Sequence, residues 1–191
     1  DIIHFPHLWR TSVFFGMLNP ALAFIYVRSV LEQRSLFRRS DIVLLSLPVI
    51  LALTFSGFYV QPAEVKLAII RDALADKSIY LEEKEGILPP GISLMIRNFF
   101  GITMAILQGF LLYRWYVYKR PALPDTPQNL SIFRWLLFFT CATGLTYILT
   151  TVQHFFQFFS EEDLYWTTSS TVMVAVVSAL VYLFLRPNIL Y

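Results

Sequence analysis

Charged side chains are scarce in this sequence. Lys, Arg, Asp and Glu make up 15% of the residues, against about 25% in ordinary soluble domains. Hydrophobic residues make up 57%, aromatic residues 17%, and the mean hydropathy is +0.60. The formal net charge of +2 indicates no particular class of partner by itself. This composition excludes an ordinary soluble domain and predicts an integral membrane protein.

Cysteine is almost absent as well. The single Cys141 lies in an apolar run, which excludes an internal disulfide and leaves no second thiol for a metal site. We expect Cys141 to be a small packing residue in a helix. Residues 1–6 lack the basic region and apolar core of a signal peptide. We therefore predict no cleavable leader and interpret the start as a loop within a longer protein.

Catalytic signatures are missing too. The sequence has no His-Glu-x-x-His motif, no glycine-rich phosphate loop, no Gly-x-Ser-x-Gly elbow and no paired carboxylates within its apolar runs. We therefore predict no enzyme activity, no catalytic or metal-binding residues and no cofactor. The matched, broken helices that are typical of transporters are not evident in the apolar runs either.

Long apolar stretches are what the sequence does contain. A bilayer core of about 30 Å needs about 20 helical residues. Five stretches bounded by charge or proline suit this length: residues 11–31, 42–60, 91–118, 132–159 and 164–185. No alternating strand pattern accompanies them, so helices rather than a barrel are expected. The predicted fold is an all-α bundle of five transmembrane helices, one domain over residues 1–191.

The charges between these stretches predict the orientation. One side of the predicted bundle carries Arg28, Arg34, Arg38, Arg39, Arg114, Lys119, Arg120, Arg134 and Arg186 against only Glu32, Asp41 and Asp125. The other side carries Asp1, Glu64, Asp72, Asp76, Glu82, Glu83, Glu85, Glu161, Glu162 and Asp163 against Arg10, Lys66, Arg71, Lys77 and Lys84. Since Lys and Arg accumulate in cytoplasmic loops, the N-terminus is predicted outside and the C-terminus in the cytoplasm.

Residues 63–77 lie within the longest link between two stretches, which runs from Gln61 to about Pro89. They place Leu67, Ile70 and Leu74 at helical spacing, with Lys66 elsewhere around the helix. We predict a short amphipathic helix on the exoplasmic surface. It fits either a lid in the membrane interface or part of an external ligand site.

A few polar residues lie within the apolar stretches, where each costs free energy unless it meets a partner or water. Arg97 and Asn98 lie about two turns into the third stretch, and Gln153 and His154 lie late in the fourth. Arg97 fits a structural arginine that snorkels or bridges helices, or a cation at the floor of an outward cavity. His154 fits an interfacial hydrogen-bonding residue, a pH sensor or a ligand contact. A metal site is disfavoured, because no second histidine or carboxylate lies nearby in these stretches.

Two further residue pairs complete the candidate set. Tyr165 and Trp166, at the start of the fifth stretch, are the expected outer rim of a ligand site lined by Arg97, Asn98, Gln153 and His154. Asn19 and Pro20 predict a kink in the first helix. Proline removes a backbone donor, and the asparagine can bond the freed carbonyls.

Four segments resemble a known family. They are His4–Arg10, Asn19–Ser29, Phe37–Asp41 and Phe184–Tyr191, and they are similar to the membrane part of AraC-type helix-turn-helix transcriptional regulators of Bacteroidota-like bacteria. The resemblance implies two transmembrane helices before this sequence and a cytoplasmic DNA-binding domain after it. The whole protein would then have seven spans in a bacterial inner membrane, with the same orientation.

The resemblance implies a signal-input domain that relays an external or membrane-derived signal to a DNA-binding output. Its expected partners are the lipid bilayer, an unidentified small-molecule or envelope signal, and a second copy of the chain in a homodimer. DNA would be contacted only through the domain outside this sequence. The alternative function is a small transporter or lipid-handling membrane protein, whose cavity would have to open to both faces.

Overall fold

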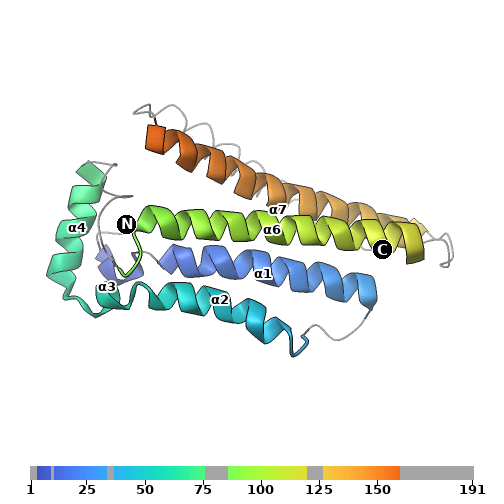
Figure 1. The fold of residues 1–191 in the computed structure, drawn as a ribbon, viewed down its shortest axis with the longest axis horizontal. Helices are drawn as coiled ribbons and strands as arrows, with labels where there is room; N and C mark the ends of the chain where they lie inside the picture. The colour runs from blue at the N-terminus through green and yellow to red at the C-terminus, as the bar shows by residue number, and fades with distance from the viewer. Residues whose placement is uncertain (1–3, 10, 34–36, 76–85, 120–126, 160–191) are drawn as a thin grey trace. The chain divides into compact units, whose positions relative to one another are not determined.

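The computed structural model describes residues 4–9, 11–33, 37–75, 86–119 and 127–159. All regular structure within these ranges is helical (Figure 1). The elements in chain order are η2 (Pro6–Leu8), α1 (Thr11–Glu32), α2 (Asp41–Leu53), α3 (Ser56–Val60), α4 (Ala63–Ala75), α6 (Pro90–Arg114), η3 (Trp115–Lys119) and α7 (Pro127–Phe159). η2 is a 3-10 turn and η3 is a π-helical turn. The predicted all-α class is confirmed for the described part of the chain.

Three helices are long and apolar enough to cross a membrane. Their apolar parts are Phe14–Glu32, Gly91–Lys119 and Asn129–Phe155, which correspond to the first, third and fourth predicted stretches. α7 begins at Pro127, a few residues before the predicted start, because proline suits the first position of a helix. The fifth predicted stretch, residues 164–185, lies outside the described residues.

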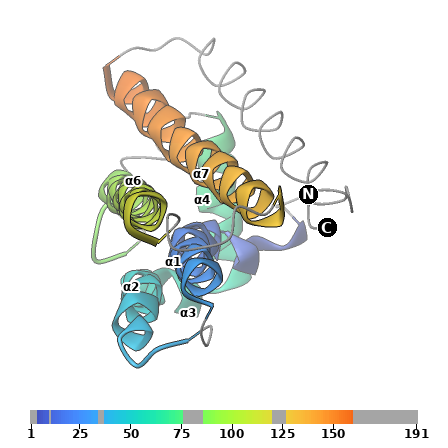
Figure 2. The same ribbon diagram turned by 90° about the vertical axis from the view of Figure 1, so that its right-hand side faces the viewer.

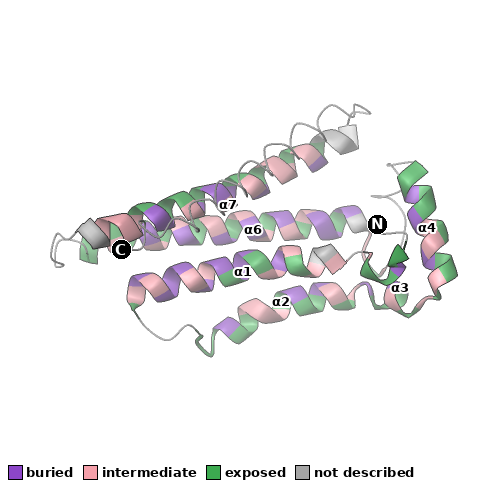
Figure 3. Cartoon of the chain, turned by 180° about the vertical axis from the view of Figure 1, so that it is seen from behind, coloured by how far each residue is buried: buried purple, intermediate pink, exposed green. Residues whose placement is uncertain are grey.

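Large apolar side chains are exposed along these helices, and Figure 3 shows how exposed residues recur along each of them. The exposed residues include Phe99, Ile106 and Phe110 on α6 and Leu145, Ile148, Val152 and Phe155 on α7. Soluble monomers rarely expose apolar surface on this scale, whereas hydrocarbon chains accept it readily. The surface of these helices is therefore compatible with a membrane protein.

The chain divides into two compact units. The first comprises Asp1–Ala21 and Arg38–Arg97, and the second comprises Leu22–Phe37 and Asn98–Tyr191. The divisions fall within α1 and α6, so each of these helices contributes to both units.

In the first unit, the second predicted stretch is not one helix. α2 and α3 are separated at Thr54, whose carbonyl accepts a hydrogen bond from the Ile87 amide at 2.9 Å. Gly86 allows this approach, because a Cβ at that position would overlap the same carbonyl. The prediction of one uninterrupted helix over residues 42–60 is wrong, since a distant loop takes a carbonyl that the helix would have used.

α4 confirms a helix in the link before α6, and its position on the membrane surface stays a prediction. Its buried residues are Lys66, Ile70 and Ala73, at the i, i+4 and i+7 positions of one stripe. Of the three residues of the predicted apolar face, Ile70 is buried and Leu67 is partly buried, whereas Leu74 is 55% exposed. The buried stripe includes the lysine because α4 packs against η2, which supplies a polar partner for it.

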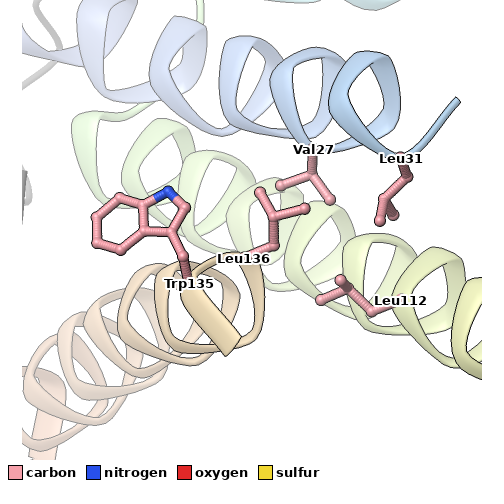
Figure 4. Close-up of a cluster of buried hydrophobic side chains, with 5 residues drawn as sticks. All are labelled: Val27, Leu31, Leu112, Trp135 and Leu136. Atoms are coloured by element: carbon pink, nitrogen blue, oxygen red, sulfur yellow. The ribbon is translucent and has the colours of Figure 1, made fainter. Parts of the chain in front are cut away.

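In the second unit, α7 runs back along α6 in the opposite direction (Figure 1). The C-terminal half of α1 meets both helices (Figure 2), and a core cluster forms there from Val27, Leu31, Leu112, Trp135 and Leu136 (Figure 4). Trp115 and Phe133 stack beside this cluster with ring centroids 5.6 Å apart. The three helices thus share one apolar core, which fixes the register of α6 on α7.

Candidate functional site

The candidate site is a buried polar contact between α6 and α7. Asn98 Nδ2 lies 3.0 Å from His154 Nδ1, and the two side chains are 1% and 6% exposed. The chain thus brings together two of the residues selected from the sequence, from positions far apart along it. Each of them lies on a helix with an otherwise apolar face, where an unpartnered amide or imidazole would be costly.

The same imidazole nitrogen has a second partner. His154 Nδ1 lies 2.7 Å from the Thr150 carbonyl oxygen of its own helix, and a carbonyl can only accept. Nδ1 must therefore carry the proton and donate it to Thr150. The Asn98 contact is then favourable when the amide turns its oxygen, not its nitrogen, toward Nδ1. In the neutral imidazole this assigns the lone pair to Nε2, the atom able to accept a hydrogen bond or a proton from a ligand.

A second polar contact joins the same two helices. The Thr140 hydroxyl donates to Gln108 Oε1 at 3.2 Å, and both side chains are buried. Neither residue was selected from the sequence. The signal that could have found Gln108 is its polar side chain within the same apolar stretch, ten positions after Asn98 and about 15 Å farther along the helix.

Small residues hold α6 and α7 close between these two contacts. A Cβ at Gly101 would overlap the ring of Tyr147, and a Cβ at Gly144 would lie 3.2 Å from the Ala105 side chain. Close approach through glycine and alanine is a common way for membrane helices to associate. The two glycines therefore let α6 and α7 approach closely enough for the polar side chains to meet.

Arg97 belongs to the first unit, whereas Asn98 and His154 belong to the second. Its side chain is half-buried and lies across Gly16 of α1, where its Cδ would come within 2.8 Å of an added Cβ. The aliphatic stem thus packs on the backbone of a neighbouring helix. The two interpretations of Arg97, as a structural arginine and as a cation at the floor of a cavity, stay predictions. Successive helix positions point about 100° apart, which explains why Arg97 and Asn98 face different neighbours.

The remaining selected residues take different places. Gln153 is partly buried on α7, and Tyr165 and Trp166 lie outside the described residues. α1 runs through Pro20 without a break, with Asn19 exposed and Pro20 buried. The kink at these two residues stays a prediction.

The first unit holds a buried cation that was not selected as a site. Lys66 is fully buried, and its Nζ donates to the Tyr59 carbonyl at 2.8 Å and lies 2.9 Å from His7 Nδ1. It also lies 5.4 Å from the centroid of the Phe58 ring. None of these three partners carries a negative charge. They tie α4 to α3 and to η2, which makes Lys66 a tertiary clamp.

The described residues include no candidate metal site. No group of three or more His, Cys, Asp or Glu residues there is arranged to hold a metal ion. Cys141 is exposed on α7. The prediction that it is a packing residue is therefore wrong for the described part of the chain.

Comparison with known proteins assigns no family. No family model matches the sequence, and the comparisons with curated proteins and with solved structures give no match either. The AraC-type resemblance and the output domain that it implies stay predictions.

Proposed function

We propose that this chain is a membrane-embedded signal-input domain that relays an external or membrane-derived signal to a cytoplasmic DNA-binding output. The observation that carries the proposal is the buried contact between Asn98 and His154. Polar groups within apolar spans are costly and usually mark a functional position. A contact that joins two spans also suits a switch, because a ligand that competes for it favours a different packing of the helices.

The proposed topology has five spans, over residues 11–31, 42–60, 91–118, 132–159 and 164–185, and the second of them is divided between α2 and α3. The three long apolar helices support three of these spans. The excess of Lys and Arg at alternate ends supports an N-terminus outside and a C-terminus in the cytoplasm. This orientation is the one that the AraC-type resemblance needs, since a DNA-binding domain must follow on the cytoplasmic side.

The signal would act on the polar contact itself. A hydrogen-bond donor or a proton that reaches His154 Nε2 changes the charge or the orientation of the imidazole, and with it the contact to Asn98. The paired helices would then shift in register or separation. In the proposed topology the fifth span, residues 164–185, follows α7 and would carry the change to the cytoplasmic side.

The test uses the complete gene in its own host. The downstream coding sequence should encode a helix-turn-helix domain. Asn98→Leu and His154→Leu at the chromosomal locus should change the same set of transcripts, because each removes one partner of the same contact, by about fivefold or more if the coupling is typical. Thr103→Val on α6 is the control, since Thr103 is exposed and bonds only within its own helix.

Two results would contradict the proposal. One is a downstream sequence without a DNA-binding domain, and the other is an unchanged transcript profile in cells that still contain both variants in the membrane. Substrate uptake into liposomes by the purified protein would instead favour the alternative, a small transporter or lipid-handling protein.

A further inference from the structure

A pocket of about 190 Å³ lies between the C-terminal ends of α1 and α6, within the second unit. Leu31 and Leu111 form its apolar walls. Its polar and aromatic lining consists of Arg28, Glu32, Arg114, Trp115, Tyr118 and Lys119. None of these residues takes part in the contact between Asn98 and His154, so the pocket is a separate feature.

The pocket carries net positive charge. Three cations, Arg28, Arg114 and Lys119, face one carboxylate, Glu32, which leaves two positive charges. Arg28 is only 7% exposed, and its guanidinium lies 5.8 Å from the centroid of the Phe24 ring. A guanidinium in such surroundings interacts strongly with an anion, because little water screens it. Arginine is also the side chain best shaped to bind phosphate oxygens.

The position of the pocket indicates where the anion comes from. The apolar parts of α1 and α6 end at Glu32 and Lys119, which both line the pocket. It therefore lies at a membrane boundary, where Trp and Tyr side chains such as Trp115 and Tyr118 are favoured. A free phosphate ion would make no favourable contact with the apolar walls, whereas a lipid would cover them with its glycerol and upper acyl chains.

The local backbone helps to form this boundary site. α6 changes from an α-helix to a π-helical turn at Trp115, and such turns often occur at functional positions. The turn widens the helix where Trp115, Tyr118 and Lys119 join Arg114 around one opening. The ring of Trp115 is held on its other side by stacking on Phe133.

We infer that this pocket binds a phosphate group supplied by the headgroup of an anionic phospholipid. Arg28, Arg114 and Lys119 donate to the phosphate oxygens, and the leucine walls contact the lipid below it. The volume is sufficient, since a cavity of about 150 Å³ holds a benzene ring, which has more heavy atoms than a phosphate group. The inference requires a membrane around the chain, but it does not depend on the signal-input proposal.

The experiment measures lipid binding to the full chain in detergent by native mass spectrometry. The probes are dioleoylphosphatidylglycerol, dioleoylphosphatidylcholine of the same chain length, and inorganic phosphate as competitor. The double variant Arg114→Gln/Lys119→Gln should bind phosphatidylglycerol roughly 25-fold more weakly, at about fivefold for each charge removed. Its binding of phosphatidylcholine should hardly change.

Arg134→Gln is the matched control. Arg134 is an exposed basic residue of α7 that does not line the pocket, so its loss should leave phosphatidylglycerol binding within about twofold of the original, as for a charge that solvent screens. If the double variant loses its helical circular dichroism, Lys119→Gln alone replaces it, since Lys119 is exposed, and a fivefold loss is then expected.

Three results would overturn the inference. They are equal binding of the two lipids, an equal loss in the Arg134→Gln control, and displacement of phosphatidylglycerol by millimolar inorganic phosphate. The last result would assign the pocket to a soluble phosphate compound instead of a lipid.

Discussion

Asn98 on α6 and His154 on α7 meet in a contact of 3.0 Å that is closed to solvent. Thr150 fixes the proton of His154 on the nitrogen that faces Asn98, so the pair has one favourable arrangement. Closer to the other end of the two helices, Gln108 and Thr140 form a second polar contact. These contacts, together with the close approach at Gly101, make the packing of α6 on α7 specific rather than merely apolar.

Asn98→Leu should lower the free energy of unfolding by about 1–3 kcal/mol, because it leaves His154 with one partner fewer in a buried place. In a double-mutant cycle with His154→Leu, the coupling energy should be about 0.6–1.7 kcal/mol. Unfolding in mixed detergent micelles, followed by circular dichroism, measures both values. Strictly additive effects of the two substitutions would show that the contact does not contribute to stability.

Gly101→Ala should destabilise the protein by about 1–3 kcal/mol, because the added methyl group overlaps the ring of Tyr147. Tyr147→Leu in the same chain should recover part of this loss. Gly109→Ala is the matched control on the same helix, since an added Cβ there meets nothing within 4 Å. It should be neutral or stabilising by up to about 1 kcal/mol. Equal effects at the two glycines would contradict this packing of α6 on α7.

The Gln108 and Thr140 pair should respond differently to single and double substitution. Thr140→Val leaves Gln108 Oε1 buried without its donor, at a cost of about 1–3 kcal/mol. Adding Gln108→Leu should restore stability almost fully, because two apolar partners leave no unsatisfied group. Thermal unfolding of the purified variants measures this recovery. A double variant less stable than either single variant would argue that this pair has a different role.

Lys66→Met should loosen α4 while keeping the apolar stem of the side chain. The variant loses the hydrogen bond to the Tyr59 carbonyl and the contact with His7, which costs about 1–3 kcal/mol locally. Amide hydrogen exchange on α4 should therefore accelerate by about fivefold or more. Arg71→Met is the control, since Arg71 is exposed on the same helix. Equal exchange in the two variants would exclude a clamp at Lys66.

The proposed orientation can be tested by labelling introduced cysteines in a Cys141→Ala background. Arg39→Cys and Glu64→Cys both place a thiol at an exposed position. A membrane-impermeant maleimide added outside intact cells should modify Glu64→Cys and spare Arg39→Cys, since basic loops remain in the cytoplasm. Labelling of Arg39→Cys alone would reverse the topology and the proposed direction of signalling.

The sequence predicted the long helices well and their contacts only in part. Residue spacing and hydropathy located α1, α6 and α7, because an apolar run long enough for a bilayer has few alternatives to a helix. The cost of a polar residue in such a run selected Asn98 and His154. The same argument should have selected Gln108, which is also a polar residue of that run and is buried on α6.

The features that the sequence did not predict depend on partners far away in the chain. The break between α2 and α3 depends on the amide of Ile87, and the buried face of α4 depends on His7. A local pattern of apolar residues cannot include such partners. It therefore predicted one long helix where there are two, and it did not indicate that Lys66 is buried beside Ile70.

The amino-acid sequence by itself determined the helical class and the long apolar helices of this protein: scarce charge and long apolar runs favour lipid-compatible helices, since hydrocarbon forces backbone groups to bond within their own segment. Only the tertiary structure decided which polar groups meet. Side-chain neighbours across two helices follow from register and from close approach at glycines, and these depend on the packing of the core rather than on any single helix. For that reason Asn98 pairs with His154, while Arg97, one residue earlier, packs on Gly16.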